Sequence, residues 1–249
     1  MLWIGALLTT GGVARGQSAT EHVASGVRDL AVLNVAAALK QFEAALAVDS
    51  TNYDALTKAA QAAIDLGEFN PSADQRAALF RSAEQYARRA VAANAGDAEG
   101  HFELAEALGR TALSQSARDR VKFAVEIREQ ALEALKLDPK HSGALHIMGE
   151  WNAEVMRLSG IVRMIAKNFL GGKVFSEASW DAAQKYLESA VANDSLRITH
   201  RLDLGVVYAD RNLKQQAIEQ FEWIARAPPT DFNDKHYKEE AARRLADLR

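Results

Sequence analysis

Apolar residues recur along most of the chain with the three- and four-residue spacing of amphipathic helices, and the predicted helices come in consecutive pairs. We predict first helices at 53–65, 98–113, 142–158 and 199–209. The second helices at 72–93 and 116–137 are long and contain no helix breaker. A further amphipathic run at 161–170 ends at Gly171-Gly172, and Ser179 is a plausible N-cap for the helix after it. The pattern predicts an all-α protein of eleven or twelve helices.

The helix pairs share a sequence signature that is clearest in the last copy. There Ala217, Phe221 and Pro229 follow the order Ala, Phe, Pro of the tetratricopeptide (TPR) repeat, in which small residues allow close helix crossing. We place repeats at about 19–52, 53–97, 98–141, 142–197 and 198–231, with a capping helix at 235–248. Only the first and last have the standard length of about 34 residues. The sequence predicts a single TPR-like solenoid domain over 17–249, a right-handed superhelix of about five repeats with enlarged middle repeats.

Composition excludes several classes of function. The 249 residues carry 33 acidic and 30 basic side chains, a formal net charge of −3, which disfavours a nucleic-acid partner. The chain has no cysteine, so disulfides, cysteine-ligated zinc and thiol catalysis are absent.

Residues 1–16 differ in character from the rest of the chain. An uncharged, mostly apolar run of twelve residues, 2–13, is followed by Ala14-Arg15-Gly16, with small residues where a signal peptidase requires them. No Lys or Arg precedes this run, and the alternative is a disordered start. We expect a signal peptide at 1–16, a mature chain from about Gln17, and an exported protein that is periplasmic or extracellular. No later stretch is long and apolar enough to predict a transmembrane segment in the mature chain.

The centre of the chain carries a more specific pattern. Four short motifs occur there in a fixed order: His101-Phe102-Glu103-Leu104-Ala105, Leu135-Lys136-Leu137-Asp138-Pro139, Gly149-Glu150-Trp151 and Leu158-Ser159. With these motifs the chain resembles the regulator of microtubule dynamics family of TPR-like proteins and its exported bacterial relatives. The resemblance extends from about Gly26 to Leu245. The resemblance implies a helical superhelix and an adaptor-like role. Eukaryotic relatives are associated with microtubules and organelle contact sites, lipid binding has been attributed to part of the family, and no catalytic residues carry over.

In TPR repeats the first helices line the concave face, and the register of each helix indicates which side chains point into the groove. These are Asp54, Thr57, Gln61, Asp65, Glu99, Phe102, Glu106, Arg110, His146, Glu150, Glu154, Leu202, Val206 and Asp210. Seven carboxylates face one arginine, and such a surface attracts cationic ligands. We hypothesise that the groove binds a basic peptide over an apolar floor of Phe102, Leu202 and Val206. The alternatives are a groove that only keeps the array soluble, or one filled by the inserted helices.

Candidate chemistry is sparse. His146, Glu150 and Glu154 form a stripe at i, i+4 and i+8 of one helix, a residue set that could hold a metal ion. The spacing differs from that of the H-E-x-x-H metalloproteases, so we interpret the stripe as a solvated groove face. The other histidines are scattered, without a catalytic triad or phosphate loop. We predict a non-enzymatic protein-interaction scaffold without a cofactor or bound metal. A lipid or apolar-ligand binder under 161–170 is the alternative, and a metal-dependent enzyme is a remote one.

Overall fold

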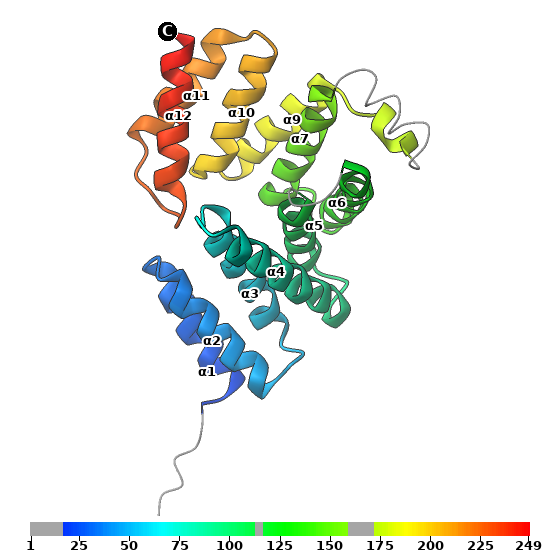
Figure 1. The fold of residues 1–249 in the computed structure, drawn as a ribbon, viewed down its shortest axis with the longest axis vertical. Helices are drawn as coiled ribbons and strands as arrows, with labels where there is room; N and C mark the ends of the chain where they lie inside the picture. Colours follow the sequence, from blue (N-terminus) through cyan, green and yellow to red (C-terminus); the bar gives the residue numbers. More distant parts are fainter. Residues whose placement is uncertain (1–16, 113–116, 159–171) are drawn as a thin grey trace, which may run out of the picture.

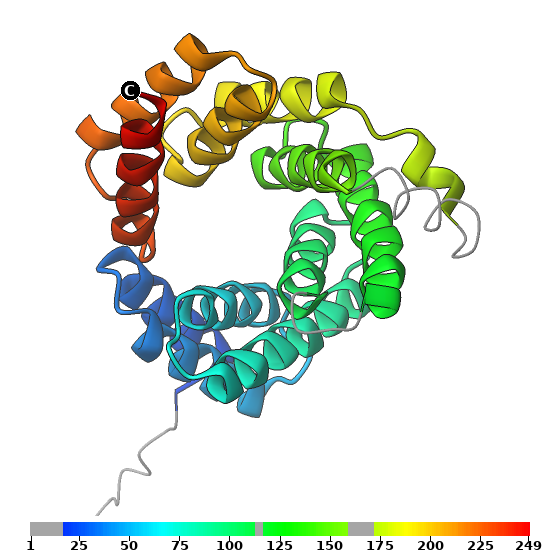
Figure 2. The ribbon, with the colours of Figure 1, turned by 45° about the horizontal axis from the view of Figure 1, so that its top comes forward.

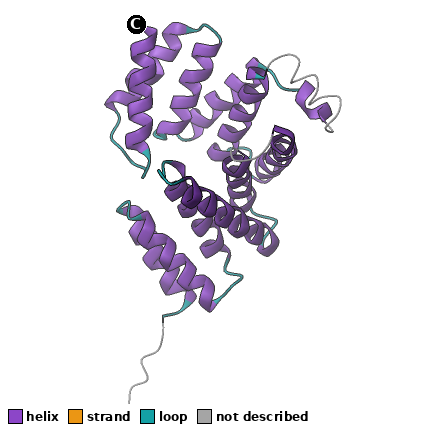
Figure 3. Cartoon of the chain, viewed as in Figure 1, coloured by secondary structure: helices purple, strands orange, loops and turns teal. Residues whose placement is uncertain are grey.

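Helices make up all the regular secondary structure in the part of the chain that the structure, a computed structural model, describes: residues 17–112, 117–158 and 172–249 (Figure 3). The helices are α1 (Ala19–Ala31), α2 (Val35–Val48), α3 (Tyr53–Glu68), α4 (Ala73–Ala93), α5 (Ala98–Ala112), α6 (Ala117–Leu137), α7 (Ser142–Arg157), η1 (Gly172–Ser176), α9 (Trp180–Asn193), α10 (Ile198–Asp210), α11 (Lys214–Arg226) and α12 (Asp234–Leu248). The predicted all-α, TPR-like solenoid is confirmed. The expected signal peptide at 1–16 and the run at 161–170 lie outside the described residues.

In most helix pairs, a large side chain of the second helix packs directly against a glycine of the first helix. A Cβ atom on Gly26 of α1 would lie 2.5 Å from Cε1 of Phe42 on α2, and one on Gly205 of α10 would lie 2.6 Å from Cε1 of Phe221 on α11. The same arrangement recurs at Gly67 with Phe80 and at Gly149 with Leu187. Because any side chain at these positions would displace its large neighbour, glycine allows the two helices of a pair to pack closely.

The second helices account for much of the enlargement of the middle repeats. Helices α4 and α6 each have 21 residues, whereas α2 and α9 have 14 and α11 has 13. The two long helices were expected from uninterrupted periodicity, and the structure confirms them. Ser179 also caps α9 as predicted, since its Oγ accepts a hydrogen bond of 3.1 Å from the Ala182 amide.

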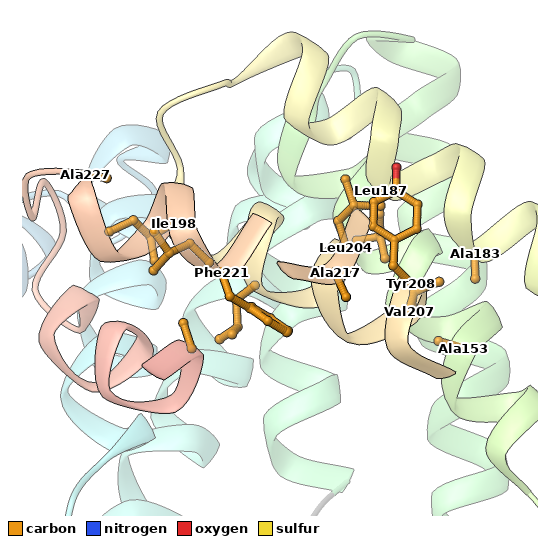
Figure 4. Packing of buried hydrophobic residues seen from close by; sticks show 13 residues of the cluster. Ala153, Ala183, Leu187, Ile198, Leu204, Val207, Tyr208, Ala217, Phe221 and Ala227 are labelled. Atoms are coloured by element: carbon orange, nitrogen blue, oxygen red, sulfur yellow. The ribbon is translucent and has the colours of Figure 1, made fainter. Parts of the chain in front are cut away.

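The apolar core of the described residues is divided into successive clusters along the array, and the largest of them lies at the C-terminal end. There Phe221, Ile198 and Ile224 are almost completely buried in a cluster shared by α7, α9, α10, α11 and α12 (Figure 4). Fully buried alanines sit where the second helices cross their partners, at Ala38, Ala83, Ala131, Ala183 and Ala217. Large side chains therefore fill the space that these small residues leave between helices.

The array curves until its last helix meets its second repeat. Figures 1 and 2 show α3, α5, α7 and α10 on the inside of the curve, with α12 returning towards the N-terminal half. Asn233 donates a hydrogen bond of 3.0 Å from Nδ2 to the Asp65 carbonyl, and Tyr237 donates one of 2.6 Å to Glu68. The sequence predicted a capping helix at 235–248, and α12 lies there. Its return to α3 was not predicted and results from the curvature of the array.

None of the helices in residues 17–112, 117–158 and 172–249 combines the length and apolar character needed to cross a membrane.

Candidate partner-binding groove

The inner face holds more carboxyl groups than cations. In the described chain, eight acidic side chains from α3, α5, α7, α10 and the loop before α12 interact electrostatically with three permanent cations and two histidines. The acids are Asp65, Glu68, Glu99, Glu103, Glu106, Glu150, Asp203 and Asp231, the cations are Lys58, Arg110 and Arg197, and the histidines are His141 and His146. Glu106 acts electrostatically on groups from all these elements, so it lies at the centre of the network.

One end of the groove is well balanced in charge. Glu99 on α5 accepts a hydrogen bond of 3.1 Å from His141 and one of 3.4 Å from Lys58 on α3. The His141 hydrogen bond and the Lys58 charge lower the pKa of Glu99, despite its partial burial. Gln61 joins this group by accepting a hydrogen bond of 3.3 Å from Lys58. The predicted residues Glu99 and Gln61 therefore lie together, with a cation that the prediction did not include.

The middle of the groove is short of positive charge. Arg110 lies 2.9 Å from Glu68 and 3.7 Å from Glu106, so one guanidinium serves two carboxylates. Burial and the neighbouring Glu106 raise the pKa of Asp65 to about 7, and burial also raises that of Glu68. Bound protons thus neutralise part of the negative charge that the nearby cations leave uncompensated.

Glu103 is a fully buried carboxylic acid next to this centre. Its side chain is 1% exposed and its Oε2 atom has no hydrogen-bond partner. Burial, together with Glu106 and Glu99, raises its pKa well above the usual range and so favours the neutral form of the carboxyl. The helix register did not place Glu103 in the groove, although this residue lies one turn after Glu99 and just before Glu106 on the same helix.

At the far end, His146 and Glu150 on α7 face Asp203 on α10. His146 Nε2 lies 2.8 Å from Asp203 Oδ2 and 4.0 Å from Glu150 Oε2. Burial raises the pKa of Glu150, as does Asp203, while solvent that reaches 45% of its side chain moderates the effect. Burial disfavours protonation of His146, but Glu150 and Asp203 outweigh it and raise its pKa. Asp203 takes the place in this cluster that the sequence assigned to Glu154.

Several predicted groove residues lie elsewhere. Glu154 and Asp210 are joined by Arg157 at the rim, at 2.5 and 2.6 Å. Asp54 is exposed at the start of α3, and the buried Thr57 hydroxyl turns back to backbone carbonyls of its own helix. Helix register predicts which face a side chain lies on, but it does not predict the ion pairs to Arg157 or the backbone hydrogen bonds of Thr57 that hold these side chains.

The residues predicted to form one apolar floor lie in two separate places. Phe102 packs on Gly143 and against the His141 ring, with centroids 4.8 Å apart, so it joins two repeats. Leu202 and Val206 line a cavity of about 340 Å³ beside α12, together with Phe69 and Tyr237. Phe69 in turn stacks on His236 with centroids 4.3 Å apart. The apolar residues of the inner side therefore hold repeats together or pack near the last helix.

Comparison with known proteins supports the fold and identifies the family. The family model for regulator of microtubule dynamics protein 1-3 matches residues 30–249. Regulator of microtubule dynamics protein 1 of Mus musculus is 25% identical over 205 residues, covering 80% of this chain and 66% of its own length. The Bos taurus protein is 26% identical over 202 residues, covering 79% and 62%. The chain thus spans slightly less than two thirds of these relatives.

Solved structures show the same fold at lower identity. A thermophilic TPR protein of Thermus thermophilus superposes with a TM-score of 0.61 at 20% identity, over 90% of this chain and 98% of its own. PilF of Pseudomonas aeruginosa gives a TM-score of 0.53 at 15% identity, over 92% and 91%. The family match covers most of the helical array described above, including the four inner helices that carry the groove. The chain belongs to the regulator of microtubule dynamics protein 1-3 family.

Proposed function

We propose that this protein is a non-enzymatic interaction scaffold whose acidic inner face binds a basic peptide segment. One observation carries the proposal: on the described inner face, seven partly exposed carboxyl groups, with the buried Glu103 behind them, share three permanent cations. The raised pKa values of Asp65, Glu68 and Asp231 follow from burial and from the other carboxylates around them. A Lys- or Arg-rich segment would supply the missing positive charge, and its binding would release the retained protons.

The side chains that would meet such a segment are within its reach. Glu106 is 28% exposed and Glu150 is 45% exposed, so both carboxylates can exchange water for a guanidinium or ammonium group. An arginine can engage a carboxylate through two parallel hydrogen bonds, which adds orientation to charge attraction. The end of the groove next to α12 is bridged by Tyr237 and Asn233, and we expect the peptide to enter away from this bridge.

Charge reversal in the groove tests the proposal. We expect Glu106→Lys/Glu150→Lys to weaken binding of a fluorescent Arg/Lys-rich peptide at least about tenfold, because each lost charge-assisted contact is worth about 1.5–3 kcal/mol. Fluorescence anisotropy in the presence of a chelator measures the affinity. Binding should also weaken as salt is raised.

The matched control reverses two exposed acids on outer helices, Glu129→Lys/Asp181→Lys, giving the same net charge. It should retain most of the peptide affinity. Equal losses in both double variants would mean that net charge attracts the peptide, and no binding to the wild type would refute the proposal. A neutral peptide of the same length serves as the second control.

The apolar run at 161–170 motivates the alternative, a lipid or apolar-ligand site, but it lies outside the described residues. We retain the peptide groove as the proposed site.

We further propose that the protein is exported with removal of residues 1–16. The support is the uncharged apolar run at 2–13 followed by small residues at 14 and 16. Intact-mass analysis of the native protein should give a chain beginning at about Gln17. A chain that retains the first sixteen residues would refute cleavage, and recovery from the cytoplasmic fraction alone would refute export.

A further inference from the structure

Three side chains of metal-ligand type meet between the fourth and fifth repeats. His146 and Glu150 stand one turn apart on α7, and Asp203 reaches them from α10. One ligand atom from each lies within 4.8 Å of the other two. The cluster therefore arises from the packing of two inner helices, and only two of its members are close in sequence.

The distances suit a small divalent cation. Zinc binds imidazole nitrogen and carboxylate oxygen at about 2.0–2.2 Å, which places two ligand atoms of a tetrahedral site about 3.4 Å apart. The observed separations from His146 Nε2, 2.8 Å to Asp203 and 4.0 Å to Glu150, lie on either side of that value. Small side-chain rotations would bring the three ligand atoms to a common centre. A nitrogen with two carboxylate oxygens favours zinc-like transition metals over calcium or magnesium, which prefer oxygen alone.

A fourth side chain supplies an independent indication. His200 lies one turn before Asp203 on α10 and is 4% exposed, and its Nδ1 atom has no hydrogen-bond partner. Its ring packs against that of His146, with centroids 4.7 Å apart. An unpaired buried polar atom costs about 1–3 kcal/mol. The His200 ring lies next to the cluster, outside the three ligand atoms that lie within 4.8 Å of one another. Burial keeps this imidazole neutral, which is the form that coordinates metal.

The surroundings also favour a cation. Solvent reaches the cluster, since the Glu150 side chain is 45% exposed and that of Asp203 is 29% exposed. Glu106 and Glu68 contribute further negative potential, and Arg110 is the cation that offsets part of it at Glu150. A divalent ion can therefore enter and would compensate charge that the fold leaves in excess.

We propose that His146, Glu150 and Asp203 bind a divalent transition-metal ion of the zinc type, with His200 at the edge of the site. The ion would bridge α7 to α10 and so fix the angle between the last two repeats. The site shares Glu150 with the proposed peptide groove, but its test requires no peptide and uses a different probe, so the two proposals can fail separately.

Metal titration of the tag-free, chelator-stripped protein tests the site. By calorimetry we expect one Zn²⁺ per chain, and at least about a tenfold loss of affinity in His146→Ala and in Asp203→Asn. Co²⁺ should give the visible absorption of a low-coordinate site, while Ca²⁺ and Mg²⁺ bind far more weakly. The control His22→Ala/Asp181→Asn removes the same chemical groups far from the cluster and should retain the wild-type affinity.

A second measurement needs no variant, in case a substitution impairs folding. In a heteronuclear NMR titration, paramagnetic Co²⁺ should broaden amide signals around positions 146–150 and 200–203 first. Broadening centred elsewhere, equal Zn²⁺ affinity in wild type and both single variants, or no binding up to about 1 mM metal would each overturn the proposal.

Discussion

Replacing Phe221 with alanine should lower the free energy of unfolding by about 3–5 kcal/mol. The side chain is 1% exposed and lies against Gly205 of α10, within the cluster that also contains Ile198 and Ile224 (Figure 4). Its removal leaves a cavity between the two helices of the fifth repeat, which cannot collapse because the backbones are already in close contact. Chemical denaturation followed by circular dichroism measures the loss.

Phe232→Ala is the matched control, because Phe232 is 40% exposed in the loop before α12. It should change the free energy of unfolding by less than about 1 kcal/mol. If the two substitutions lower the free energy of unfolding by the same amount, the packing described for the fifth repeat would be wrong. An Ile224→Val variant in the same cluster should fall between the two, at about 0.5–1.5 kcal/mol.

Asp65→Asn should stabilise the protein at high pH and have much less effect at low pH. The folded-state pKa of Asp65 is raised to about 7, from a usual value of 3.8, by burial and by Glu106. Since the folded state holds this proton more tightly than the unfolded state, the stabilisation from protonation is full below about pH 4 and is lost as pH rises through 7. At one pKa unit per about 1.36 kcal/mol, the gain from asparagine should grow by about 2–3 kcal/mol between pH 5 and pH 8.

Denaturation of both proteins at the two pH values, with a chelator present, measures this difference. Exposed Asp247→Asn is the control and should differ between pH 5 and pH 8 by less than about 0.5 kcal/mol. A stabilisation by Asp65→Asn that is equal at both pH values would show that Asp65 is ionised throughout. A destabilisation at pH 8 would show instead that its attraction to Arg197 exceeds the repulsion from the other carboxylates.

Local sequence patterns predicted the helices well, because each helix depends on periodicity and capping within a few residues. The extent of α4 and α6, and the cap at Ser179, follow from the absence of breakers and from one side chain. Ala217 and Phe221 of the last signature are both buried on α11, as small and large packing residues of one helix pair should be. Most of the helical architecture could thus be predicted from patterns within a few residues of each other.

The groove was predicted only in part, because half of its chemistry depends on how far the array curves. Register on α3, α5 and α7 correctly brought together Asp65, Glu106, Arg110, His146 and Glu150. Asp203 and Arg197 face this set from α10 and its N-cap, and Tyr237 joins it from α12. Tyr237 is 169 residues from its partner Glu68, and no periodicity within a repeat predicts a contact of that range.

The contact of α12 with α3 fixes the number of repeats. An open solenoid can gain or lose a repeat at modest cost, because each unit touches only its neighbours. Here an added repeat would move Asn233 and Tyr237 beyond Asp65 and Glu68. A deleted repeat would leave Asn233 and Tyr237 too far away to reach them. We therefore expect length variation among relatives to be confined to helices and loops within repeats. The long α4 and α6 helices are extensions of that kind, and they leave the closure intact.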